Sequence, residues 1–127
     1  MSKLILLTCV ALSLSLSLSL SLAKAGDPVA GEQQFAPCSG CHTVTAHEDD
    51  GVGPNLHGLF GRKSGSKAEF NYSNAMKAAG IVWNEDTLAK FLADPSALVP
   101  DNNMSFIGLQ DAQARADIIA YLKEATK

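Results

Sequence analysis

The chain has 127 residues, of which 46% are hydrophobic and 18% charged, and its formal net charge at pH 7 is −3. This length corresponds to one domain, and the acidic balance argues against a protein that binds nucleic acid through a basic surface. The hydrophobic residues are concentrated at the amino-terminal end. The rest of the chain can therefore bury only a modest core, and a small domain of this kind usually needs an additional stabilising group.

Residues 1–25 have the features of a secretory signal. Lys3 precedes a Leu-rich stretch that runs to Leu22, and small residues follow at the two positions that a signal peptidase recognises, the second being Ala25. The alternative is an uncleaved membrane anchor, because the stretch approaches the roughly 20 residues that cross a bilayer. The serines of the stretch and the small-residue site favour cleavage after Ala25. We therefore expect residues 26–127 to be the mature domain, with no permanent membrane anchor.

Cleavage there changes both the charge and the cysteine content. The chain has ten basic and thirteen acidic residues, so loss of Lys3 and Lys24 leaves eight basic residues and a net charge of −5. Such an acidic domain is a poor binder of nucleic acid. Two cysteines remain, Cys38 and Cys41, in an exported protein that meets oxidising conditions.

Helix caps and stops predict four helices in the mature domain, and no segment has the alternating pattern of a β-strand. Residues 42–71 and 95–108 are rich in Gly, Pro, Asn or Ser and are predicted to be irregular. The sequence thus predicts an all-α domain with long loops. The helices are expected from Pro28 to about Phe35, after Ser73 through Ala79, after Asn84 through Ala93, and from about Asp111 to Ala125, with Ala114, Ile118, Tyr121, Leu122 and Ala125 on one apolar face.

Cys38-Ser39-Gly40-Cys41-His42 is the Cys-x-x-Cys-His pattern that attaches a c-type haem covalently. On one helical turn the residues i and i+3 face the same way, so both sulfurs can reach the vinyl groups of one macrocycle. His42 can then bind the iron, and the buried haem completes the core. A structural disulfide and a thioredoxin-like redox pair are the alternatives, but the redox pair expects a preceding strand and a β-rich fold.

The second axial ligand has four candidates in the mature chain: Met76, Met104, His47 and His57. Met104 fits best, because it lies in an irregular segment that can be shaped around a metal. Met76 is expected to line the core, His57 to be a loop histidine and His47 to be solvated.

A His and Met pair leaves no open iron position, which favours one-electron transfer over oxygen or peroxide chemistry. The alternative is a haem peroxidase or gas-binding sensor, which needs a labile sixth ligand.

Residues 26–127 resemble a class I cytochrome c, specifically the mitochondrial-type soluble cytochromes of bacteria. The matching segments are residues 38–44, 53–63, 70–75, Trp83, 100–106 and 119–123. The resemblance implies the all-α cytochrome c fold, with helices and long loops wrapped around one haem whose axial ligands are His42 and Met104. It implies that the Pro54 carbonyl accepts the other ring N–H of His42, which fixes the orientation of the imidazole.

The resemblance also implies roles for the wall of the haem pocket and for the whole protein. Tyr72, Trp83, Arg62 and Ser73 are expected to hold a buried haem propionate, whose charge would otherwise be costly. The implied function is that of a periplasmic, monomeric one-electron carrier, not an enzyme, that docks transiently to membrane-bound or soluble redox proteins.

Three features depart from the family pattern. Phe91 stands where the family often has a Tyr, and Met76 where it often has an Asn, which predicts a drier pocket. The positions that match the family's lysine ring around the haem edge carry no basic residue here, which predicts weaker electrostatic steering during docking. These positions are Pro37, Gly51, Ser96, Ala97, Asn103, Gln110 and Asp111.

Overall fold

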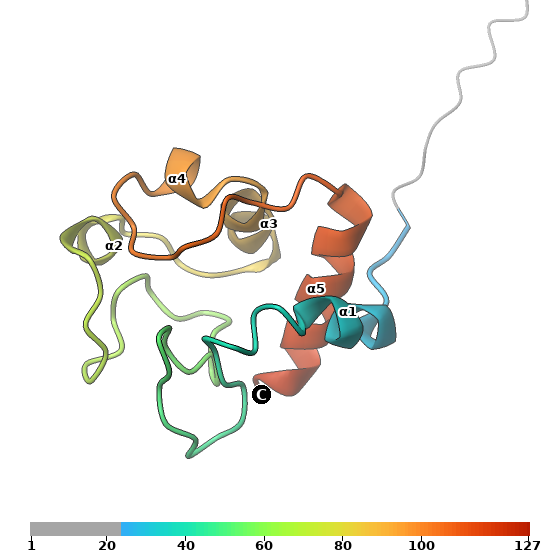
Figure 1. Ribbon diagram of the computed structural model, residues 1–127, viewed down its shortest axis with the longest axis horizontal. Helices are drawn as coiled ribbons and strands as arrows, with labels where there is room; N and C mark the ends of the chain where they lie inside the picture. Colours follow the sequence, from blue (N-terminus) through green and yellow to red (C-terminus); the bar gives the residue numbers. More distant parts are fainter. Residues whose placement is uncertain (1–23) are drawn as a thin grey trace, which may run out of the picture.

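The computed structural model describes residues 24–127, which form five α-helices joined by long loops (Figure 1). Within these residues no sheet forms, and the β-structure amounts to one antiparallel bridge between Lys63 and Val82. The predicted all-α class is confirmed. Most of the predicted signal, residues 1–23, lies outside the described residues. The helices are α1 (Pro28–Phe35), α2 (Asn74–Ala78), α3 (Glu85–Ala93), α4 (Pro95–Leu98) and α5 (Ala112–Ala125).

Four of these helices begin at the predicted positions. The Asp27 carboxylate accepts from the Val29 N–H at 2.9 Å, and Pro28 follows as the first helical residue. Asn84 and Thr87 form a reciprocal capping box, in which each side chain accepts from the other residue's backbone N–H. Because these caps are local in sequence, the helix positions are predictable without the tertiary structure.

The prediction that residues 95–108 are irregular throughout was wrong at their start. Asp94 ends α3, since its N–H donates to the Lys90 carbonyl, but its carboxylate also accepts from the Ala97 N–H at 3.0 Å. With Pro95 in the first turn, this cap starts the four-residue helix α4. One Asp-Pro pair therefore ends one helix and begins the next.

The first and last helices cross in close contact (Figure 1). A Cβ atom added at Gly31 would lie 2.0 Å from the Asp117 carbonyl oxygen, so the backbones touch there. Ile118 and Leu122 of the predicted apolar face are buried, whereas Ala114, Tyr121 and Ala125 are half-buried. The buried hydrophobic core consists of Phe35, Leu59, Trp83, Leu88, Phe91, Leu92, Val99, Ile118, Ile119 and Leu122. No helix within residues 24–127 has the length and apolar character needed to cross a bilayer.

Candidate functional site

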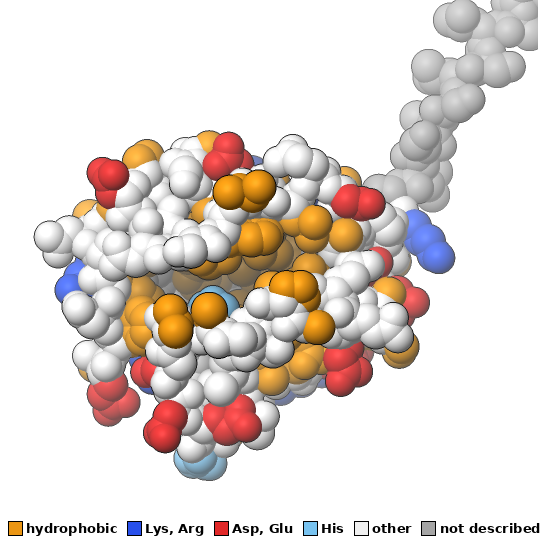
Figure 2. Space-filling view, viewed as in Figure 1, with side chains coloured by type: hydrophobic (Ala, Val, Ile, Leu, Met, Phe, Trp, Pro, Cys, Tyr) orange, Lys and Arg blue, Asp and Glu red, His pale blue; other side chains and the backbone are white. Residues whose placement is uncertain are grey.

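The loops enclose a hollow on one face of the molecule. In Figure 1 the loops of residues 36–73, teal to yellow-green, lie below it, and the segment from 99 to 110, orange, lies above. Figure 2 shows the same face as an open cleft, with hydrophobic side chains along its walls and on both lips, and with a histidine at its lower edge. Several hydrophobic side chains of the two segments are only half-buried against the core, including Cys38, Met104 and Phe106. The cleft is thus an apolar surface that the protein's own side chains leave uncovered.

Cys38 and Cys41 lie on one helical turn that continues beyond α1. The Cys41 and His42 N–H groups both donate to the Cys38 carbonyl at 3.0 Å. Both cysteines are free thiols, and burial raises the pKa of the Cys38 thiol, with a further rise from the neighbouring Cys41. A thioredoxin-like pair needs a lowered pKa at its reactive cysteine, and here a helix, not a strand, precedes the motif. Both observations disfavour the alternative that Cys38 and Cys41 are a thioredoxin-like redox pair.

The His42 ring is held from one side by the Gly53-Pro54 turn. Its Nδ1 atom lies 2.8 Å from the Pro54 carbonyl oxygen, and because a carbonyl can only accept, Nδ1 is the nitrogen that carries the proton. A Cβ atom at Gly53 would lie 2.3 Å from the ring's Cε1 atom. This arrangement leaves Nε2 as the nitrogen with a free lone pair, which is the state that a metal-binding imidazole requires.

A network around Asn55 fixes the loop that carries this turn. Asn55 is 4% exposed, and its side-chain amide donates to the carbonyls of Thr45 and Glu48 at 2.9 and 2.8 Å. The Arg62 guanidinium donates to the carbonyls of Asn55 and His57 at 3.2 and 3.1 Å. Asn55 was not predicted as a site residue. Its place after Gly53-Pro54 was a signal, because Asn side chains in turns often form hydrogen bonds with nearby backbone groups.

Asp50 connects the buried Asn55 to Lys67, which is partly exposed. Its carboxylate accepts from the Asn55 N–H at 2.6 Å and pairs with Lys67 at 2.6 Å. These two contacts hold the pKa of Asp50 below its ordinary value, and the hydrogen bond from the Asn55 backbone N–H has the larger effect. Lys67 is therefore engaged within the loop. Nothing in the sequence distinguishes Asp50 from its acidic neighbours Glu48 and Asp49.

Trp83 and Arg62 are brought together with Tyr72 on one side of the site. The backbone N–H of Trp83 donates to the Arg62 carbonyl at 2.9 Å. Trp83 is 7% exposed, and its ring packs edge-on against Phe91 at 5.2 Å between centroids. Burial raises the pKa of Tyr72, although the nearby Arg62 charge opposes the rise. Ser73 has a second use, since its hydroxyl oxygen accepts from the Met76 N–H at 3.1 Å and caps α2.

The four candidates for a second iron ligand have different surroundings. Met104 is half-buried against the core, and its N–H donates to the Asn102 side chain at 2.9 Å. Met76 is also half-buried but lies in α2. His47 is exposed and has a φ of 67°, whereas His57 is half-buried and its carbonyl accepts from Arg62.

Comparison with known proteins identifies the family. The cytochrome c family model matches residues 28–126. The chain belongs to the cytochrome c family. It is 51% identical over 98 residues to cytochrome c2 of Rhodomicrobium vannielii, which covers 77% of this chain and 78% of that protein. It is 46% identical over 105 residues to cytochrome c of Ginkgo biloba, which covers 82% and 93%.

A solved structure supports the same conclusion at the level of the fold. Cytochrome cH from Methylobacterium extorquens superposes with a TM-score of 0.73 at 44% identity, covering 77% of this chain and 98% of that one. As a cytochrome c, the chain is a haem c electron carrier and not an enzyme. The residues present fit that group, because two free thiols share one turn, His42 has a free Nε2, and an apolar cleft lies open beside them.

Proposed function

We propose that this cytochrome c is a periplasmic one-electron carrier whose haem is attached through Cys38 and Cys41, with His42 and Met104 as its axial ligands. The observation that carries the proposal is the His42 contact with Pro54, which presets a histidine next to two free thiols for binding iron. When bound, the haem supplies reversible one-electron chemistry at its iron. The chain supplies the ligands, their orientation and the apolar surroundings.

The residues around His42 act on its position and basicity. The Pro54 carbonyl accepts the Nδ1 proton and so keeps Nε2 unprotonated, while Gly53 lets the loop backbone approach the ring. Asn55 and Arg62 hold that loop in place through four hydrogen bonds to backbone carbonyls. In the folded protein His42 is therefore restrained in the orientation that iron ligation requires.

Met104 is the second ligand in this proposal because its backbone is fixed in the upper lip of the cleft. The Asn102 side chain accepts from its N–H, and its carbonyl accepts from the Phe106 N–H at 2.9 Å. A thioether on the iron raises the reduction potential and leaves no position for oxygen or peroxide. A peroxidase or gas sensor would need this ligand to dissociate readily.

The ligand assignment is tested by Met104→Ala with Met76→Ala as the matched control. We expect Met104→Ala to convert the low-spin visible spectrum to a high-spin one and to lower the reduction potential, while Met76→Ala keeps both near wild type. The reverse pattern would assign Met76. Rapid carbon monoxide binding by the reduced wild-type protein would instead support the sensor or peroxidase alternative.

Tyr72, Trp83, Arg62 and Ser73 are proposed to surround a haem propionate. The support is that Arg62, Trp83 and Tyr72 meet on one side of the site, where a guanidinium lies beside a half-buried phenol. A buried carboxylate needs such donors. Trp83→Phe, which keeps an aromatic ring against Phe91 but removes the indole N–H donor, should change the reduction potential. An unchanged potential would remove Trp83 from this role.

Docking to membrane-bound or soluble redox proteins is proposed to use the lips of the cleft. Val52 and Ile107 are 84% and 95% exposed, and residues 36–58 and 99–114 contain no Lys or Arg. The contact is thus apolar and only weakly steered by charge. The rate of electron transfer from the reduced protein to a redox-partner protein should not fall steeply between low and physiological salt. Val52→Lys with Ile107→Lys should make that rate fall with salt, and a steep fall in the wild type would contradict the proposal.

The location rests on the amino-terminal features of the chain. Cleavage after Ala25 would release residues 26–127 as a periplasmic monomer. Its support is the small-residue site together with the packing of the next residue, Gly26, against α5. Intact mass of the exported protein tests the site of cleavage.

A further inference from the structure

The segment that follows the proposed cleavage site is built into the fold. The Asp27 N–H donates to the Asp117 carboxylate of α5 at 2.8 Å. A Cβ atom added at Gly26 would lie 2.1 Å from the Ala116 carbonyl oxygen and 3.0 Å from the Ala120 Cβ atom. Gly26 and Asp27 are thus held against α5, whereas Lys24 and Ala25 before them are exposed.

Asp117 is a buried carboxylate without a counter-ion. It is 5% exposed, and within residues 24–127 no Lys, Arg or His side chain forms an ion pair with it. Its hydrogen-bond donors are neutral: the Asp27 N–H and the side-chain amides of Gln113, at 2.9 Å, and Gln34, at 3.5 Å. A buried charge is costly unless it is paired with an opposite one.

An unsatisfied polar group lies beside Asp117. The Oε1 atom of Gln34 is buried and has no hydrogen-bond partner, while the Nε2 atom of the same amide donates to Asp117. Buried acceptors without a donor are rare in folded proteins. Once Lys24 has left with the signal, the site in residues 26–127 contains a carboxylate that lacks a cation and an amide oxygen that lacks a donor.

We infer that the α-ammonium group of Gly26, created by cleavage after Ala25, is the counter-ion of Asp117. The inference rests on the cleavage site proposed above. Hydrolysis breaks the Ala25–Gly26 C–N bond, the water oxygen goes to the Ala25 carbonyl carbon, and the Gly26 nitrogen becomes an ammonium group. Adjacent backbone nitrogens are at most about 3.7 Å apart, so this charge forms within about 6.5 Å of the carboxylate oxygen that binds the Asp27 N–H.

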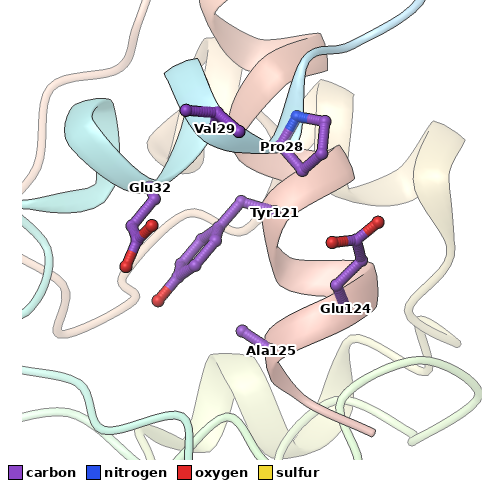
Figure 3. Close-up of a pocket in the computed structure, with 6 residues that line it drawn as sticks. All are labelled: Pro28, Val29, Glu32, Tyr121, Glu124 and Ala125. Carbon is purple, nitrogen blue, oxygen red and sulfur yellow. The ribbon is translucent and has the colours of Figure 1, made fainter.

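The other charged groups nearby do not replace this ammonium. Lys24 leaves with the signal, the Asp27 carboxylate caps α1, and Arg115 donates to the Leu109 carbonyl. Glu32 and Glu124 lie on either side of Tyr121 farther along the contact between α1 and α5 (Figure 3), and both are acids. Cleavage at this bond thus supplies the cation that the folded α1–α5 contact lacks.

The test is the reactivity of the terminal amine in the exported, haem-loaded protein. Cyanate reacts with the unprotonated amine, so a neighbouring carboxylate slows the reaction at pH 7 by raising the pKa of the amine. We expect wild type to react about three- to tenfold more slowly than Asp117→Asn. A chain with one serine inserted after Ala25, which keeps Asp117 but moves the charge outward, should also react faster than wild type. Glu69→Gln, an equal charge change on a distant loop, should match wild type.

Equal rates in wild type and in both altered forms would overturn the inference, as would cleavage at another bond shown by intact mass. The insertion keeps the test valid if Asp117→Asn does not fold. The visible spectrum of each sample reports separately whether the haem is attached, so failure of the proposed electron-carrier site is distinguishable from failure of the ion pair.

Discussion

Gly53 is the residue whose size most directly controls the candidate iron ligand. Its missing side chain leaves the space in which the His42 ring lies, since an added Cβ would come within 2.3 Å of Cε1 and 2.7 Å of Nδ1. The ring cannot move away without losing its hydrogen bond to the Pro54 carbonyl. A single methyl group at residue 53 therefore acts on both the position and the tautomer of His42.

We predict that Gly53→Ala lowers the free energy of unfolding of the haem protein by about 1–3 kcal/mol, as overpacking does, and perturbs the Soret circular dichroism. Guanidinium unfolding and visible spectra measure the two effects. The control is Gly40→Ala, where an added Cβ would meet nothing closer than 4.0 Å. A loss of stability in the control equal to that of Gly53→Ala would refute the steric explanation.

At the scale of elements, most helices were predictable because their signals are local. Asp27, Ser73, Asn84 and Asp111 each cap a helix through atoms no more than three residues away. The α4 helix was not predicted, because Asp94-Pro95 is a stop signal in sequence and becomes a start signal only when the chain turns at Asp94.

Some features of the molecule depend on adjacent residues and could be predicted from the sequence, whereas others depend on residues far away in the chain. The Cys-x-x-Cys-His motif is visible in the sequence because its chemistry depends on adjacent residues. Asp117 and Gly31 are different, because their environment depends on residues about 90 positions away in the chain. Long-range contacts of this kind leave no pattern in one sequence, so they require the structure.

The α1–α5 contact gives a prediction at this scale. Gly31→Ala would place a Cβ 2.0 Å from the backbone oxygen of Asp117, which cannot rotate away, so the two helices must separate. We expect a loss of about 3 kcal/mol in the free energy of unfolding. The exposed Glu32→Ala in the same helix should change it by less than about 0.5 kcal/mol. Thermal or guanidinium unfolding measures the free energy of unfolding of both variants. Similar losses for Gly31→Ala and Glu32→Ala would show that the helices tolerate separation.

For the whole molecule, the carboxylate of Asp50 predicts how stability depends on pH. Its pKa is lowered in the folded state by the Asn55 N–H and Lys67, so at acidic pH the unfolded chain binds more protons than the folded one. This stabilisation is complete above the unfolded pKa of about 3.9 and is lost as the pH falls through the lower folded value. Wild type should thus lose more stability than Asp50→Asn between pH 5 and about pH 3. Equal losses in guanidinium titrations would rule out this contribution.

The small core and the open apolar cleft together describe a polypeptide completed by its cofactor. Within residues 24–127, ten buried hydrophobic residues form the core, while Met104, Phe106 and Cys38 remain half-buried around the cleft. A group that binds only the folded state stabilises it, so the haem-free chain should be largely unfolded.

We propose above that both cysteines of the exported chain carry one haem. Intact mass of the purified periplasmic protein under denaturing conditions tests it most directly, because a covalent group survives denaturation. We expect the mass of residues 26–127 plus one haem. The mass of the bare chain, or of that chain less two hydrogens for a Cys38–Cys41 disulfide, would contradict it.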